Sequence, residues 1–173
     1  MKSFALAALL ACAACAPPTA WTHGVPNLHE VQPGVYRGGQ PTADGWAYLR
    51  GLGVRHVLKL NFDSEGDDRG AVAFGLTVHQ VAIYPAAFLS TFDGPTPMQV
   101  RQIVSVLLDQ KLRPLYIHCT HGHDRTGLAV GLLRLETGWT KPTAYREMRM
   151  LGFHPELLGL VRAWEEYQPR RRP

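Results

Sequence analysis

Two residues near the middle of the chain have the types and spacing needed for nucleophilic chemistry on an anion. Cys119 and Arg125 are separated by five residues, and Gly122 supplies backbone freedom between them. A thiolate is a strong nucleophile, and a guanidinium is a planar fork that can hold two oxygens of a tetrahedral oxyanion at once. The spacing therefore predicts attack by a cysteine thiolate on a bound oxyanion such as a phosphate ester.

A strand and a helix must position this stretch. Residues 115–118 are an apolar, β-favouring run that predicts a buried strand, and residues 125–135 favour a helix. The loop amides would point inward, where the helix dipole adds about half a positive charge and favours the thiolate form of Cys119. We expect Thr126 to donate a hydrogen bond to the sulfur. The residues expected to bind phosphate are Cys119, Thr120, His121, Gly122, His123, Asp124, Arg125 and Thr126.

The motif resembles that of a known family. His118-Cys119-x5-Arg125-Thr126-Gly127 is similar to the signature loop of the cysteine-dependent protein-tyrosine and dual-specificity phosphatases. The Asp-Arg pair at 124–125 resembles the loops of bacterial lipid and dual-specificity phosphatases and of myotubularins, although His123 stands where many of those loops carry Lys. Residues 36–41 are similar to the Tyr-Arg-Ser-x-Gln-Pro opening of the plant-and-fungal atypical dual-specificity phosphatases. The resemblance implies that His118 braces the loop by hydrogen bonds.

The pattern along the chain predicts an α/β fold with a central, mostly parallel sheet flanked by helices. The signature loop would lie between the last core strand and a buried helix, because residues 128–135 are apolar nearly all round. Residues 31–37 are expected to form a Pro-Gly turn between two short β stretches. Other strands are expected at 56–61 and 76–83, and other helices after Thr42, Thr96, Thr140 and Pro155. An acidic loop with Asp63, Glu65, Asp67 and Asp68 follows the strand at 56–61.

Two aspartates compete for the role of general acid. Asp93 precedes Gly94-Pro95 and a helix capped by Thr96, and in the resembling families the acid comes from a loop in this region. A turn aspartate is the simpler interpretation, since Asp before Gly is common in turns. Asp124, inside the signature loop, is the rival acid.

The N-terminal segment resembles a bacterial lipoprotein signal. Lys2 precedes an apolar run that is too short to span a bilayer, and residues 9–12, Leu-Leu-Ala-Cys, are similar to a lipobox. We therefore expect a signal peptide over 1–11, a lipidated spacer over 12–26 anchored through Cys12, a phosphatase domain over 27–168 and a basic tail over 169–173. The protein would be exported to the bacterial cell envelope and face the periplasm. An ordinary cleaved signal with incidental cysteines is the alternative.

Charge and ligand patterns limit the partners. The net charge of +4 is spread along the chain, unlike the concentrated basic face of a nucleic-acid-binding protein. His118, Cys119, His121 and His123 are possible zinc or copper ligands, but alternation within a tight loop points them in different directions. We expect no metal and no cofactor, and place His121 and His123 at the pocket rim, where protonation favours anionic substrates.

The function predicted from the sequence is hydrolysis of phosphate monoesters on protein tyrosine, serine or threonine through a cysteinyl-phosphate, by a monomeric enzyme. A phosphoinositide or inositol-phosphate substrate would fit the same mechanism. Three non-phosphatase functions stay open: a rhodanese-like sulfurtransferase, a His/Cys metal-binding module and a phosphate-binding domain without turnover. Arg-Thr-Gly at 125–127 favours the phosphatase.

Overall fold

Five short strands form one sheet in the computed structural model, which describes residues 23–84 and 94–170. Their order is β1-β2-β5-β3-β4, and only the β1–β2 pair is antiparallel. The strands are β1 (His29–Gln32), β2 (Val35–Gly38), β3 (His56–Lys59), β4 (Thr77–Gln80) and β5 (Leu115–His118). Because β5 is central and parallel to both neighbours, its carboxyl end lies beside those of β2 and β3, where ligands bind in open α/β sheets.

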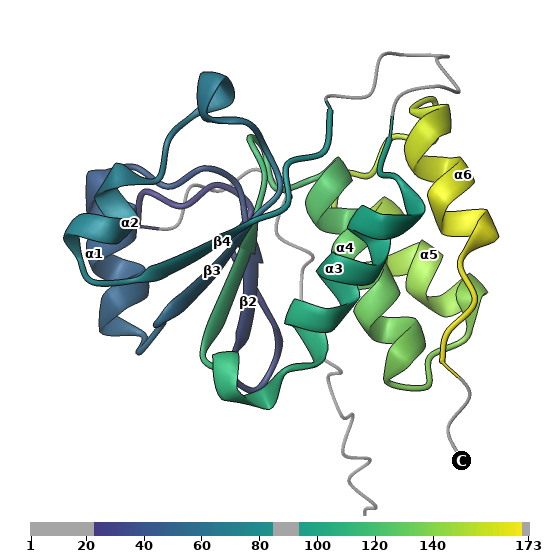
Figure 1. The fold of residues 1–173 in the computed structure, drawn as a ribbon, viewed down its shortest axis with the longest axis horizontal. Helices are drawn as coiled ribbons and strands as arrows, with labels where there is room; N and C mark the ends of the chain where they lie inside the picture. The colour runs from purple at the N-terminus through teal and green to yellow at the C-terminus, as the bar shows by residue number, and fades with distance from the viewer. Residues whose placement is uncertain (1–22, 85–93, 171–173) are drawn as a thin grey trace, which may run out of the picture.

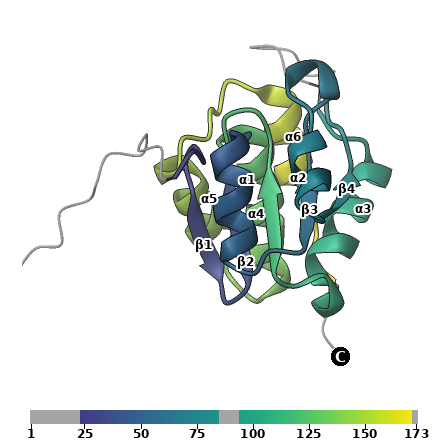
Figure 2. The same ribbon diagram turned by 90° about the vertical axis from the view of Figure 1, so that its left-hand side faces the viewer.

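Helices cover both faces of the sheet. One face is covered by α1 (Ala43–Gly51) and α2 (Arg69–Ala73), and the other by α3 (Pro97–Leu108), α4 (Asp124–Glu136), α5 (Lys141–Met150) and α6 (Leu158–Glu166), as Figures 1 and 2 show. The two faces have separate apolar clusters, a small one around Trp46 and a larger one around α4. Two 3₁₀ turns complete the described elements, at Asp63–Glu65 and Gln110–Leu112.

The helices begin where the capping residues predict. Thr42 and Thr140 cap α1 and α5, and Thr96 forms a capping box with Gln99 at the start of α3. Residues 125–135 of α4 are all buried, which confirms that this helix lies at the centre of the domain. The expected α/β class with a mostly parallel sheet flanked by helices is confirmed.

Some predicted boundaries were wrong. Regular pairing of β4 ends at Gln80 and not at Ile83, because the chain then bends toward the signature loop, where the Ile83 carbonyl accepts a hydrogen bond from Arg125. The last helix begins at Leu158, after a turn that includes Pro155. The acidic loop is partly helical, since it contains the turn at 63–65 and leads directly into α2.

The segments expected to form the signal peptide and most of the spacer, including Cys12, lie outside the described residues, as does Asp93. None of the helices in the described ranges is long and apolar enough to cross a bilayer.

Candidate active site

The signature loop connects β5 to α4 at the carboxyl end of the central strand. Cys119 directly follows β5, and its side chain lies in the larger apolar cluster, almost entirely buried. Arg125 is the second residue of α4, so the loop brings it back over the strand end. The structure thus has the strand, loop and buried helix that the sequence predicts.

Gly122 makes the tight bend of the loop possible. Its φ is +78°, a left-handed conformation that favours glycine, and a Cβ there would collide with the backbone of Gly38 and Gly39 at the end of β2. Its carbonyl oxygen accepts hydrogen bonds from Arg37 Nη2 at 2.5 Å and from Asn27 Nδ2 at 3.0 Å. Two side chains that are distant in the sequence therefore hold the loop through its Gly122 carbonyl.

Arg37 is a buried cation that sequence reasoning did not assign to the site. Burial lowers its pKa to about 10, with the negative charge of Cys119 opposing that shift, so it stays protonated at neutral pH. Its Nε and Nη1 atoms have no hydrogen-bond partner within residues 23–84 and 94–170. Arg37 thus adds a positive charge under the loop. In the sequence, its position in the Tyr-Arg opening of the domain was the only indication of this role.

Arg125 is held by a carboxylate from the acidic loop. Glu65 accepts from Nη1 at 2.8 Å and from Nη2 at 2.7 Å, and the Thr120 hydroxyl also donates to Glu65 at 3.1 Å. The hydrogen bond with Arg125 is the main reason that the pKa of Glu65 falls to about 2. Burial alone would lower the pKa of Arg125, but the bond to Glu65 and the charge of Cys119 raise it. The guanidinium of Arg125 therefore binds both oxygens of a carboxylate.

His118 is braced by a second acid of the same loop. Its Nε2 lies 3.0 Å from Asp68 Oδ2, and its ring stacks on Tyr116 and makes a T-shaped contact with Trp46. Burial opposes ionisation of Asp68, yet the bond and charge of His118 keep its pKa below the usual value. Lys59 Nζ lies 3.7 Å from the other oxygen of Asp68. The hydrogen bond implied for His118 is thus present, with a partner that sequence reasoning left unassigned.

Thr126 and Asp124 have partners other than those expected at the reaction centre. The Thr126 hydroxyl donates to the Gly38 carbonyl at 3.4 Å, because the end of β2 packs beneath the loop. The hydrogen bond expected from Thr126 to the sulfur stays a prediction. Asp124 Oδ1 accepts from the backbone N–H of His154 at 2.8 Å and lies 3.0 Å from its Nδ1. Asp124 therefore joins the loop to the segment after α5.

The remaining loop histidines lie close to each other. The rings of His121 and His123 are 6.4 Å apart, and His123 packs on Gly152. Burial lowers the pKa of His123, with the charge of Asp124 opposing the shift. Within the described ranges no group of three or more His, Cys, Asp or Glu side chains is arranged to hold a metal ion.

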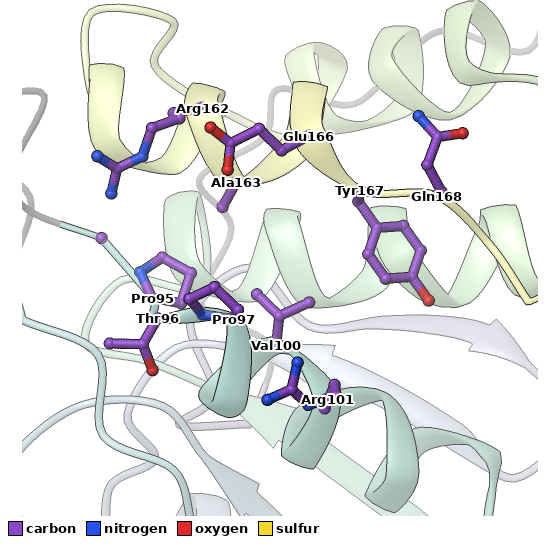
Figure 3. A pocket seen from close by; sticks show the side chains of 11 residues that line it. Pro95, Thr96, Pro97, Val100, Arg101, Arg162, Ala163, Glu166, Tyr167 and Gln168 are labelled. Carbon is purple, nitrogen blue, oxygen red and sulfur yellow. The ribbon is translucent and has the colours of Figure 1, made fainter.

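A cavity of about 560 Å³ lies beside the segment that follows Asp93. It runs between the start of α3 and α6, and Figure 3 shows Arg162, Glu166 and Tyr167 facing Pro97 and Arg101 across it. Its lining includes Gly94 but no residue of the signature loop. Asp93 itself lies outside the described residues.

Comparison with known families agrees with this geometry. The model of the tyrosine phosphatase family matches residues 25–155, which include β1 to β5 and the signature loop. The chain therefore belongs to the tyrosine phosphatase family, and the resemblance to cysteine-dependent phosphatases is confirmed.

Two kinds of relative are similar in sequence. The chain is 30% identical over 124 residues to an inositol diphosphatase, DSP3, of Arabidopsis thaliana, covering 70% of this chain and 60% of that protein. It is 31% identical over 141 residues to the dual specificity protein phosphatase TpbA of Pseudomonas aeruginosa, covering 79% of this chain and 61% of that protein. The chain thus spans about 60% of the length of these relatives.

Solved structures show the same fold. The crystal structure of P. aeruginosa TpbA superposes with a TM-score of 0.65 at 25% identity, over 87% of this chain and 89% of that one. The core catalytic domain of the PP-IP phosphatase SIW14 from S. cerevisiae, in complex with citrate, gives a TM-score of 0.67 at 22% identity, over 82% and 85% of the two chains.

Proposed function

We propose that this chain hydrolyses phosphate monoesters, with phosphotyrosine, phosphoserine and phosphothreonine in proteins as the substrates. The observation that carries the proposal is the bidentate grip of Arg125 on the Glu65 carboxylate, at the mouth of a loop that begins with a buried cysteine. A guanidinium that binds one carboxylate through both terminal nitrogens has the geometry to hold two oxygens of another anion, namely the phosphoryl group. Family membership supports the same chemistry.

The reaction would proceed in two displacement steps. The Cys119 thiolate attacks phosphorus in line, the S–P bond forms and the ester P–O bond breaks, while Arg125 and the loop amides stabilise the equatorial oxygens. A carboxylic acid gives its proton to the departing oxygen. A water molecule then attacks the cysteinyl-phosphate, loses its proton to that carboxylate, and releases inorganic phosphate and the thiolate.

Asp93 is our choice for the acid. Its place before α3 corresponds to the loop that carries the acid in similar phosphatases, whereas Asp124 already accepts two hydrogen bonds from His154. A loop-bracing role for Asp124 is consistent with those contacts.

An inositol-phosphate substrate is the second candidate. The likeness to plant inositol diphosphatases favours it. The mechanism is unchanged, and only the group attached to the phosphate differs.

A substrate panel tests the proposal. Purified protein should release phosphate from a phosphotyrosine peptide, and a chelator should not reduce the rate. No release from phosphotyrosine, phosphoserine or inositol phosphates would contradict phosphatase activity, whereas loss of activity on chelation would favour a histidine metal site. Release from inositol phosphates alone would favour the second candidate.

We also propose that the protein is a lipid-anchored monomer of the bacterial cell envelope. The support is the lipobox-like sequence at 9–12 and the Thr- and Pro-containing spacer that follows. Expressed in a bacterium with lipoprotein processing, the protein should carry acyl groups on Cys12, and Cys12→Ala should remove them. A water-soluble, unlabelled mature chain that begins after residue 15 would show an ordinary secretory signal instead.

A further inference from the structure

A second cavity, of about 370 Å³, lies between the edge strand β1 and helix α5, both of which are labelled in Figure 2. This volume is in the range of small-molecule sites. The cavity is lined by β1, by α5 with the residues that flank it, and by Arg37 of β2. Its described lining includes no residue of the signature loop, so it is separate from the candidate active site.

Arg37 gives this cavity a buried cation with free donors. Its side chain is 1% exposed, and its Nε and Nη1 atoms have no hydrogen-bond partner among the residues that the structure describes. The third nitrogen, Nη2, donates to the carbonyl of Gly122. Leaving a charged donor buried without an acceptor is destabilising. A ligand in the cavity that carries an anionic oxygen would therefore find unused donors in Arg37.

The other charges around the cavity leave the charge of Arg37 uncompensated. Glu147 lines the cavity, but both of its oxygens are bound by Arg134, at 2.9 and 2.7 Å. Arg146 and Glu30, whose side chains are exposed, have opposite charges that balance each other. One buried positive charge matches a ligand with one negative charge, whereas a phosphate dianion would bring a surplus charge into a buried site.

The walls of the cavity are largely apolar. They include Val31, Leu151 and two large side chains that are partly or mostly exposed, Trp139 and Met150. Apolar walls around a few polar groups are typical of sites for organic ligands. Because Arg37 is almost inaccessible, a ligand reaches it only when a lining side chain moves, and the unbranched, adaptable side chain of Met150 can do so.

We propose that this cavity binds an organic carboxylate with an apolar body. The carboxylate accepts hydrogen bonds from Arg37, and the apolar body contacts Trp139 and Met150. The site is regulatory, since the residues that form it do not include the nucleophile or the phosphate clamp.

Two lining residues connect the cavity to the signature loop. Arg37 donates directly to the Gly122 carbonyl, and His29 Nε2 lies 3.0 Å from Asn27 Oδ1, whose Nδ2 donates to the same carbonyl. A bound carboxylate would neutralise the charge beneath the loop and compete with this carbonyl for Arg37. We therefore expect the ligand to weaken phosphate binding and to slow turnover, a consequence that rests on the proposed phosphatase function.

Calorimetry with octanoate and 1-octanol tests the site on the full chain. Octanoate should bind and 1-octanol should not, because only octanoate has a charge for Arg37. Met150→Glu should weaken octanoate binding roughly 5-fold, the effect of one like charge near the surface. Met98→Glu is the matched control, since Met98 is 62% exposed and Met150 is 63% exposed, and Met98 does not line the cavity. Equal binding of the two ligands, no binding of octanoate, or equal affinities in the two variants would overturn the proposal.

Two further measurements separate this site from the active site and from the proposed function. Saturating inorganic phosphate should weaken octanoate binding without abolishing it, whereas complete loss would place octanoate on the signature loop and contradict the proposal. Octanoate should also lower kcat/KM for an aryl phosphate roughly 2- to 10-fold, the range for weakening one hydrogen bond, and less in Met150→Glu. Octanoate binding by a protein without turnover would retain the site and contradict only the proposed function.

Discussion

At the scale of single residues, Glu65 differs most from its sequence-based interpretation, which placed it only in an acidic loop. Its carboxylate takes one N–H from each terminal nitrogen of Arg125 and a third hydrogen bond from Thr120. Such an ion pair orients a guanidinium more strictly than packing alone, because both partners are planar forks. We interpret Glu65 as the residue that positions Arg125.

Replacing this carboxylate tests the positioning role. Glu65→Gln should lower kcat/KM by about 10- to 100-fold, the range for losing a hydrogen bond to a charged group, and should weaken inhibition by inorganic phosphate. Asp67→Asn is the control, because Asp67 pairs with exposed Arg69 in the same loop. Tighter phosphate inhibition in Glu65→Gln would instead show that Glu65 competes with phosphate for the guanidinium.

The two candidate acids can be told apart by leaving-group dependence. If Asp93 is the acid, Asp93→Asn should slow hydrolysis of a phosphoserine peptide by about 10²- to 10⁴-fold and that of a nitrophenyl phosphate much less, since nitrophenolate leaves without a proton. Asp124→Asn should reduce both rates alike, because the acceptor of the His154 hydrogen bonds loses its negative charge and braces the loop less firmly. The reverse pattern would place the acid inside the signature loop.

At the scale of elements, the strand–loop–helix unit was predictable because its signals are local. The apolar run at 115–118, the glycine at 122 and the long apolar helix adjoin in the sequence, and each specifies its own conformation. The partners Glu65 and Asp68 were not predictable, because they lie 60 and 50 residues away from Arg125 and His118 and come together only through the order of strands in the sheet.

The sequence also failed to predict two features of short elements, namely helix α2 and the burial of Arg37, and both failures have a physical reason. The helix α2 has five residues and follows an acidic stretch that is typical of a loop, so periodicity carries little signal there. Arg37 is on a four-residue strand whose burial depends on β1 and β5 lying on either side.

The signature loop depends on Gly122 through both conformation and space. Gly122→Ala should destabilise the protein by more than the roughly 1–3 kcal/mol of a left-handed non-glycine residue, because its Cβ also overlaps Gly38, and activity should be lost. Gly75→Ala is the matched control, with φ of +72° and no atom within 4 Å of the added Cβ. Equal losses of unfolding free energy, measured in urea, would show that the loop tolerates the methyl group.

At the scale of the whole molecule, the ion pair couples stability to pH. The pKa of Glu65 is lowered from 4.5 to about 2, so its contribution to the unfolding free energy is complete above pH 4.5 and is lost as pH falls toward 2. The difference in unfolding free energy between wild type and Glu65→Gln should therefore shrink between pH 6 and pH 3. A difference that stays constant over this range would contradict a charged pair.

The central claim is that Cys119 is the nucleophile and Arg125 the phosphate clamp of a two-step phosphatase. Cys119 directly follows β5 and begins the loop that brings Arg125 back over the strand end, so nucleophile and clamp belong to one short segment. Cys119→Ser should abolish turnover while leaving phosphate binding largely intact, and Arg125→Ala should damage both.

The most direct measurement is to mix the wild-type protein with an aryl phosphate, quench with acid during turnover, and locate the phosphoryl group by mass spectrometry of the peptides. We predict a phosphoryl group on Cys119 that is absent from unreacted protein and from Cys119→Ser. Turnover by Cys119→Ser, or a phosphoryl group found on another residue, would contradict the mechanism.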